Sequence, residues 1–136
     1  MNLMEKVCYE KGQGGCLERK ITEEDIIKFA EVTGDFNPVH INKEKAEKTI
    51  FGRQIAHGMM TASLISAVLG TVFPGEGTIY LGQKMNFKKP VYIGDTITAR
   101  VEIIDVKQNG KARLMTNVFN QNGECVIDGE AEVKLP

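Results

Sequence analysis

The second half of the chain alternates apolar and polar residues with a period of two, which is typical of β-strands. In the clearest stretch, residues 96–107, the apolar side chains Ile97, Ala99, Val101 and Ile103 fall on one face. Asn109-Gly110 predicts a type I′ hairpin turn, and Asn122-Gly123 predicts a second hairpin. We therefore expect an antiparallel meander built from residues 78–87, 96–107, 111–120 and 124–135.

A long stretch before the meander, residues 54–75, contains no Asp, Glu, Lys or Arg. It predicts a helix from His57 or Gly58 to about Val72. About 20 apolar residues can cross a bilayer, but this stretch holds too many polar residues for a membrane span, so we expect a helix buried in protein. Bulk is supplied by Met60, Leu64, Val68 and Leu69. A stripe of small residues, expected to allow close backbone approach, contains Ala62, Ser66 and Gly70.

The first third of the chain predicts a strand over residues 16–21 and two further helices. Thr22 and Asp25 approximate a capping box for a helix that ends at Gly34. Pro38 excludes regular helix throughout residues 35–41, and Asn42 caps a short polar helix over residues 43–49. The buried stripe of the first helix is expected to contain Ile26, Ile27, Phe29, Ala30 and Val32.

One long helix beside several long strands is an α+β arrangement, and 136 residues suit a single domain over residues 1–136. The net charge of −1 gives no electrostatic case for nucleic acid or for an anionic membrane. Cys8, Cys16 and Cys125 are scattered and odd in number, which indicates a reducing compartment and lacks the spacing of a zinc site. The N-terminus has no apolar run of signal-peptide length, so we expect a cytoplasmic protein. From the cysteine spacing we expect no metal site.

The candidate catalytic residues lie in two short segments, residues 35–40 and residues 57–58. Asp35 and His40 flank the kink at Pro38, and a carboxylate and an imidazole at one water could exchange protons with it. Gly58, at the first turn of the buried helix, offers an unshielded N–H that could polarise a carbonyl oxygen. Spacing alone leaves other interpretations open: Asp35 could cap a turn, Gly58 could only allow packing, and His57 fits a structural role better than a catalytic one.

The segment Asp35-Phe36-Asn37-Pro38-Val39-His40 resembles the hydratase 2 motif of the MaoC-like (R)-specific enoyl-CoA hydratases. Further resemblance to short bacterial members that supply polyhydroxyalkanoate synthesis extends over residues 55–66, 75–83, 87–95 and 129–136. The resemblance implies the hot-dog fold, in which an antiparallel sheet wraps a long helix. It also implies reversible hydration of a trans-2-enoyl-CoA to the (R)-3-hydroxyacyl-CoA, with an acyl-CoA substrate, no separate cofactor and a homodimer.

The same resemblance suggests roles for individual residues. Asp35 and His40 would hold the catalytic water, with Asp35 as base and His40 as proton donor at C2. The N–H of Gly58 would bind the thioester oxygen. Ser66 would support the site by hydrogen bonding near Asp35, and Asn37 would shape the loop. Arg53, Lys88 and Lys89 are candidates to meet the phosphates of CoA.

Three alternatives remain open at this stage. A thioesterase on the same fold usually carries an acidic residue on the central helix, and residues 58–72 contain none. An acyl-carrier-protein dehydratase would act on the same acyl thioester and is harder to separate. A non-catalytic acyl-CoA-binding module would not need both Asp35 and His40.

Overall fold

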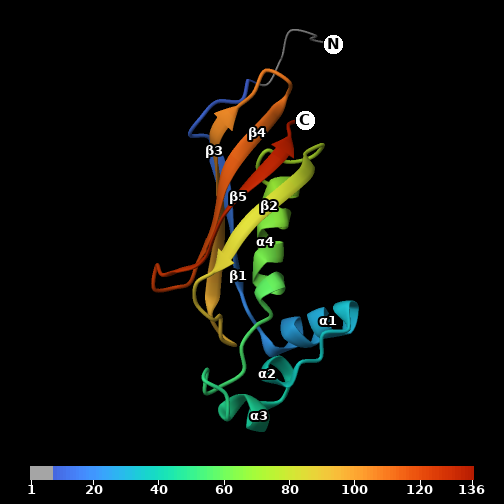
Figure 1. Ribbon diagram of the computed structural model, residues 1–136, viewed down its shortest axis with the longest axis vertical. Coiled ribbons are helices and arrows are strands. Elements are labelled where there is room, and N and C mark those ends of the chain that lie inside the picture. Colours follow the sequence, from blue (N-terminus) through green and yellow to red (C-terminus); the bar gives the residue numbers. More distant parts are fainter. Residues whose placement is uncertain (1–7) are drawn as a thin grey trace.

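The computed structural model describes residues 8–136, which form one curved antiparallel sheet and a small set of helices. The sheet order is β1-β3-β4-β5-β2, so β1 and β2 are its edges (Figure 1). Its strands are β1 (Gly14–Lys20), β2 (Ile79–Phe87), β3 (Thr96–Val106), β4 (Lys111–Phe119) and β5 (Cys125–Lys134). The predicted strands are confirmed, and β3-β4-β5 is a meander, but the prediction that residues 78–87 begin this meander is wrong: β2 pairs with β5 at the opposite edge from β1.

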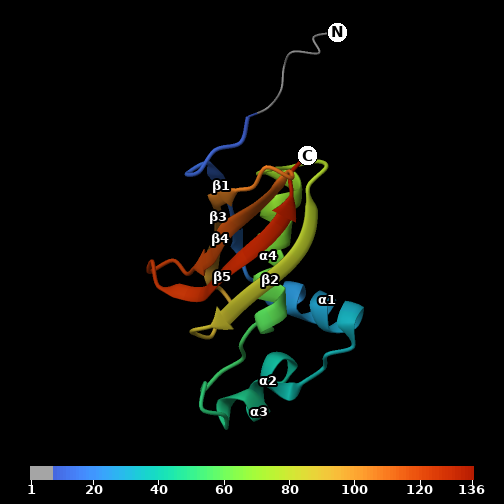
Figure 2. The ribbon, with the colours of Figure 1, turned by 45° about the horizontal axis from the view of Figure 1, so that its top comes forward.

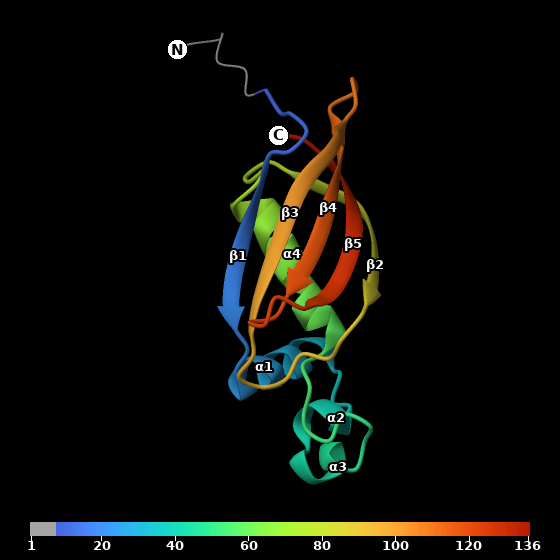
Figure 3. The same ribbon diagram turned by 90° about the vertical axis from the view of Figure 1, so that its left-hand side faces the viewer.

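The long helix α4 (Gly58–Thr71) lies against one face of this sheet, and the strands curve around it (Figure 3). The apolar face predicted for β3 is buried against the helix side, with Ile97 1% exposed and Val101 0% exposed. From α4, the predicted bulky residues Met60, Leu64, Val68 and Leu69 are all buried. This pairing of a sheet face with one helix is the hot-dog arrangement expected from the sequence.

Two details of α4 and the hairpins differ from the sequence predictions. Ser66 and Gly70 are exposed and no atom approaches the position of a Gly70 Cβ, so these two residues of the small-residue stripe face outward within one chain, whereas Ala62 is buried. The turn at Asn109-Gly110 is not type I′, because only Gly110 has a positive φ (81°). A single left-handed glycine is what longer hairpin loops with a glycine bulge require.

Three helices form a cap at the end of the sheet nearest to Gly58 (Figure 2). They are α1 (Glu23–Thr33), α2 (Pro38–Ile41) and α3 (Lys43–Glu47). The predicted capping box is present: Asp25 N donates to Thr22 Oγ1 at 3.1 Å, and Thr22 N donates to Asp25 Oδ2 at 3.2 Å. The predicted buried stripe is too wide, since Val32 is 86% exposed and Ile27 43% exposed; the rest of the protein covers only one side of α1.

The edge strand β2 is the most exposed apolar part of the sheet. Its side chains Ile79, Leu81 and Phe87 are 52%, 46% and 54% exposed. No helix in residues 8–136 has both the length and the apolar character needed to cross a membrane.

Candidate active site

The segment between α1 and α3 includes the short helix α2, and it brings the side chains of Asp35 and His40 close together. Gly34 ends α1 in the left-handed conformation, with φ of 79°, and so turns the chain toward α2. Asp35 Oδ1 then accepts a hydrogen bond from Asn37 N at 3.2 Å, and Asn37 Oδ1 accepts one from Val39 N at 3.3 Å. Because Pro38 has no N–H to satisfy at the start of α2, this short helix can begin directly after the loop.

The imidazole of His40 has a defined orientation and tautomer. Its Nδ1 lies 2.8 Å from the backbone oxygen of Ile55, and a carbonyl oxygen can only accept, so Nδ1 carries the proton. In the neutral ring, Nε2 is therefore a free acceptor. Burial, the largest influence, lowers the pKa of His40, and the neighbouring His57 lowers it further; the Ile55 hydrogen bond and the Asp35 charge oppose this. His40 is thus held mainly neutral near neutral pH.

His57 joins the two candidate residues from the other side. Its ring stacks on His40, with centroids 3.9 Å apart and planes 27° apart. Its Nε2 donates to the backbone oxygen of Asp35 at 2.9 Å. One titratable atom of each of the three residues, Asp35, His40 and His57, lies within 4.8 Å of the other two. A carboxylate and an imidazole therefore meet in one place, as the sequence predicted.

The N-terminus of α4 opens beside this pair. The residue that precedes the helix, His57, makes no side-chain capping hydrogen bond, so the N–H of Gly58 is left to other partners. A Cβ on Gly58 would lie 2.7 Å from Phe87 Cε1, so glycine is required for the close approach of that ring. Gly58 lines a cavity, and its N–H at the positive end of the helix dipole suits a carbonyl oxygen that gains negative charge.

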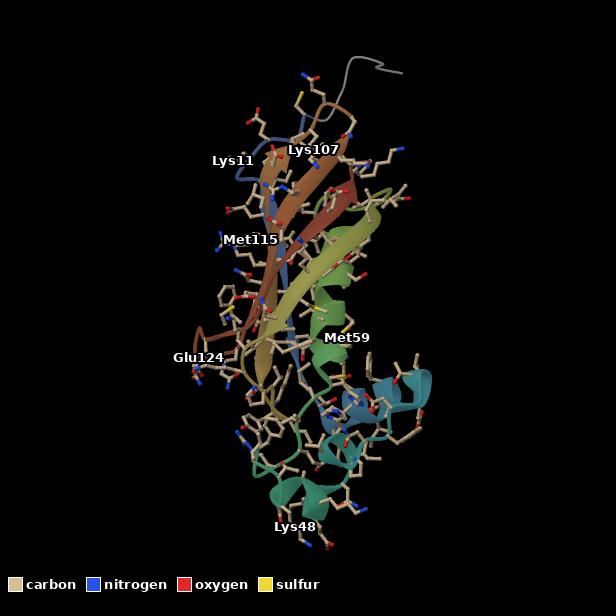
Figure 4. All side chains as sticks on the ribbon, viewed as in Figure 1. Lys11, Lys48, Met59, Lys107, Met115 and Glu124 are labelled. Carbon is tan, nitrogen blue, oxygen red and sulfur yellow. The ribbon has the colours of Figure 1, made fainter. Side chains whose placement is uncertain are left out.

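A cavity of about 480 Å³, hereafter the main cavity, connects these groups. Its walls are mostly apolar, and its polar residues come from the segment between α1 and α3, from the start of α4 and from the segment after β2. In Figure 4 the side chain of Met59 marks that end of α4, and Lys107 lies at the far end of the sheet. The lining residues that matter for the argument are Asp35, His40, His57, Gly58, Phe87, Lys88 and Lys89. An apolar pocket with few convergent polar groups is typical of small-molecule sites.

The remaining predicted residues lie in different places. Asn37 shapes the loop, as expected, but is not on the cavity wall. Ser66 is exposed and lies eight residues beyond Gly58, about 12 Å along the axis of α4 at 1.5 Å per residue. Within one chain Ser66 faces outward, so its supporting role near Asp35 stays a prediction.

Among the candidates for phosphate contact, Lys88 and Lys89 line the main cavity, whereas Arg53 lies outside it. Lys88 forms an exposed ion pair with Asp128 at 3.6 Å, and Lys89 pairs with Glu124. The guanidinium of Arg53 lies 3.7 Å over the ring of Tyr92.

His57 has the hydrogen-bonded structural position predicted from the sequence, since its Nε2 donates to the backbone oxygen of Asp35 and its ring stacks on His40. One contributor to the site was missed from the sequence. The backbone oxygen of Ile55 fixes the His40 tautomer. A backbone acceptor carries no signature in the sequence, so only the fold could have revealed it.

The three-residue cluster contains ligand types that suit a metal ion, but most of its nitrogens are engaged. His40 Nδ1 and His57 Nε2 donate to backbone oxygens. His57 Nδ1 is buried without a partner among the described residues. That leaves the Asp35 carboxylate and His40 Nε2, one ligand fewer than the three protein ligands of a catalytic zinc site.

Comparison with known proteins shows the family of this chain. The model of the MaoC like domain family matches residues 9–122. An (R)-specific enoyl-CoA hydratase of Aeromonas caviae is 44% identical over 128 residues, which cover 93% of this chain and 96% of that protein. The unliganded structure of the R-hydratase PhaJ1 from Pseudomonas aeruginosa superposes with a TM-score of 0.91 at 45% identity, covering 94% of this chain and 83% of that chain.

A relative with a different named substrate is also similar. The mitochondrial 3-hydroxyacyl-acyl-carrier-protein dehydratase of Solanum lycopersicum is 37% identical over 121 residues, which cover 87% of this chain and 72% of that protein. The relatives thus include proteins named for acyl-CoA substrates and a protein named for acyl-carrier-protein substrates.

Proposed function

Because this chain belongs to the family of MaoC-like domains, we propose that it is an (R)-specific enoyl-CoA hydratase. The enzyme adds water reversibly to a trans-2-enoyl-CoA and gives the (R)-3-hydroxyacyl-CoA. The similarity to the Aeromonas caviae hydratase supports this activity, and so does the convergence of Asp35, His40 and Gly58 on one cavity. No separate cofactor is needed, because conjugation with the thioester already makes C3 electrophilic.

We propose that Asp35 and His40 hold the attacking water between them. Asp35 can accept a proton from the water as its oxygen bonds to C3. The neutral His40 accepts a hydrogen bond at Nε2, because Nδ1 already donates to Ile55. For His40 to deliver a proton to C2, Nε2 must first take one from the water, directly or through Asp35. The hydroxyl and the proton of one water thus end on C3 and C2, and both side chains return to their starting states.

The N–H of Gly58 would receive the thioester oxygen during this step. As water attacks C3, electrons move toward that oxygen and create an enolate-like charge. A donor already aimed at the charge stabilises it without reorganisation, and removal of one such donor typically costs ~3 kcal/mol. Phe87, packed against Gly58, would help to keep bulk water away from this oxygen.

The observation that carries the proposal is the position of the Asp35 carboxylate and the His40 imidazole beside the open N-terminus of α4. The direct test is hydration of crotonyl-CoA, followed as loss of absorbance by the conjugated double bond, with chiral analysis of the product. The (R)-3-hydroxy product is expected. Formation of free CoA with no hydroxyacyl product would instead indicate a thioesterase.

A homodimer is part of the proposal. The exposed apolar side chains on β2, Ile79, Leu81 and Phe87, lie along an open sheet edge, which a second copy can extend by strand pairing. The outward face of α4, including Met59 at 57% exposure, would be covered in the same step. Sedimentation of the wild type as a dimer supports this arrangement, and a stable monomer with full activity contradicts it.

The cellular setting is proposed from the thiols and the relatives. Cys8, Cys16 and Cys125 are all free thiols, which fits the reducing cytoplasm. Supply of hydroxyacyl-CoA for polyhydroxyalkanoate synthesis is the pathway suggested by the sequence resemblance. Deletion of the gene in a polymer-producing host, followed by polymer quantification, tests it.

A further inference from the structure

A second cavity lies next to the main cavity and has a different character. It encloses about 330 Å³ and shares Lys89 and Pro90 with the main cavity as wall residues. Its other walls are almost entirely polar: Arg53, Tyr92, Asp95, Asn120, Gln121, Asn122 and Glu124. A ligand that leaves the main cavity past Pro90 therefore enters a polar environment, hereafter the polar cavity.

The carboxylates in the polar cavity are already satisfied by protein groups. Asp95 accepts hydrogen bonds from Tyr92 N at 2.9 Å and from Gln121 Nε2 at 3.0 Å. Glu124 pairs with Lys89 and accepts a hydrogen bond from Asn120 Nδ2 at 3.1 Å. Neither carboxylate therefore needs a cation from a ligand, and neither is paired with Arg53.

Arg53 is arranged differently from the other charged residues of this cavity. It forms no ion pair with residues 8–136, and the central carbon of its guanidinium, Cζ, lies over the Tyr92 ring, 3.7 Å from the ring centroid. Stacking on a ring occupies the face of the guanidinium but leaves the N–H groups in its plane free to donate. A guanidinium held in this way loses less conformational freedom when it binds a phosphate edge-on. The positive charge in this cavity is thus ordered and unpaired.

We infer that the polar cavity binds the phosphate-bearing nucleotide end of the CoA substrate and that Arg53, supported by Tyr92, is its anchor. The inference rests on the proposed hydratase function and adds a structural reason for preferring CoA thioesters to acyl-carrier-protein thioesters. A CoA thioester carries a nucleotide with phosphates, whereas an acyl group on a carrier protein carries only the phosphopantetheine arm. A site for the nucleotide therefore favours free CoA thioesters over acyl-carrier-protein substrates.

The test compares two thioesters with the same acyl group. Crotonyl-CoA contains the nucleotide, and crotonyl-N-acetylcysteamine lacks all phosphates. For Arg53→Ala we expect KM for crotonyl-CoA to rise about tenfold, the size of one lost charge-assisted hydrogen bond, with kcat within twofold of wild type. KM for crotonyl-N-acetylcysteamine should not change. Arg53→Lys should recover part of the loss, and Arg100→Ala, which removes an exposed arginine on β3, is the matched control.

An equal rise of KM for both thioesters, or no rise for crotonyl-CoA, would overturn the inference. Calorimetric binding of adenosine 3′,5′-bisphosphate gives a readout that does not depend on turnover. The wild type should bind it and Arg53→Ala should bind it about tenfold more weakly, by the same reasoning on one charged contact. If the wild type hydrates neither thioester, the proposed function fails, while unequal binding of the bisphosphate by wild type and variant would still support the polar cavity. Equal binding by both proteins contradicts it in every case.

Discussion

The imidazoles of His40 and His57 are stacked with their centroids 3.9 Å apart, and each ring donates to a backbone oxygen that lies a few residues before the other histidine in the sequence. His40 Nδ1 donates to Ile55, two residues before His57, and His57 Nε2 donates to Asp35, five residues before His40. The two histidines therefore cross-link the Asp35–His40 loop to the segment that leads into α4. Positions of the acid/base pair and of the helix N-terminus are coupled through this link.

Replacement of His57 tests this coupling. His57→Phe keeps a ring to stack on His40 but removes the donor to Asp35 O. Loss of one buried hydrogen bond should lower the free energy of unfolding by about 1–3 kcal/mol. Because the backbone of Asp35 loses this hydrogen bond, kcat should also fall, while KM should change little. Urea denaturation and initial rates measure both.

The same experiment can contradict the coupling. If His57→Phe loses stability but keeps wild-type kcat, then His57 contributes only to folding. His57→Asn is the companion variant, since it retains a donor but no stacked ring. A larger loss of kcat in His57→Phe than in His57→Asn would point to the hydrogen bond rather than the stack.

The pH dependence follows from His40. Burial, followed in the same direction by His57, lowers its pKa from the ordinary 6.5. A neutral Nε2 is needed to accept from the water, so kcat/KM should fall at acidic pH as His40 becomes protonated, with the midpoint of that fall below pH 6.5. A pH profile of crotonyl-CoA hydration measures the acidic limb. A limb centred at or above 6.5 would contradict this account of His40.

The same shift has a sign for stability. The unfolded chain binds a proton at its ordinary pKa of 6.5, and the folded chain binds it only at lower pH. Between these values the unfolded state holds more protons, so His40 makes the folded state lose stability as pH falls below 6.5. Comparison of wild type with His40→Gln by denaturation at several pH values isolates this contribution. It should be absent in the variant.

Gly58→Ala tests the opening of α4. The added methyl would meet Phe87 Cε1 at 2.7 Å, but that atom is the far end of a half-exposed ring that can move aside. Unfolding free energy should therefore change by no more than about 1 kcal/mol, since alanine also favours the helix. Displacement of the ring into the main cavity should lower kcat by roughly 100-fold, the size expected for a disturbed oxyanion donor. Wild-type kcat in a folded variant would remove Gly58 from the mechanism.

Metal removal should leave the enzyme unchanged. Only the Asp35 carboxylate and His40 Nε2 remain for a ligand in the cluster, because the other donor nitrogens are bound or buried. Dialysis against EDTA, with metal analysis before and after, should give the same kcat as untreated protein. Loss of activity that zinc or another divalent cation restores would show that the water is activated by a metal instead.

The sequence predicted the strands, the central helix and the pairing of Asp35 with His40, because these follow from local periodicity and from one short motif. It could not predict that Ile27 and Val32 stay exposed, since an apolar stripe on a helix does not show how wide a surface of the protein packs against it. The supporting role of Ser66 stays a prediction, because its surroundings depend on what covers the outward face of α4. The hydrogen bond from His40 to Ile55 O depends on a contact between distant segments, which no local pattern encodes.

The central claim is that Asp35 and His40 act on one water, and isosteric substitution of each tests it most directly. We expect Asp35→Asn and His40→Gln to remain folded and to bind crotonyl-CoA, while kcat for hydration falls by at least about 100-fold in each, the lower range for general acid–base catalysis. The double variant should be little worse than either single variant, because the two groups work as a unit. Near-normal hydration by both single variants would contradict the account.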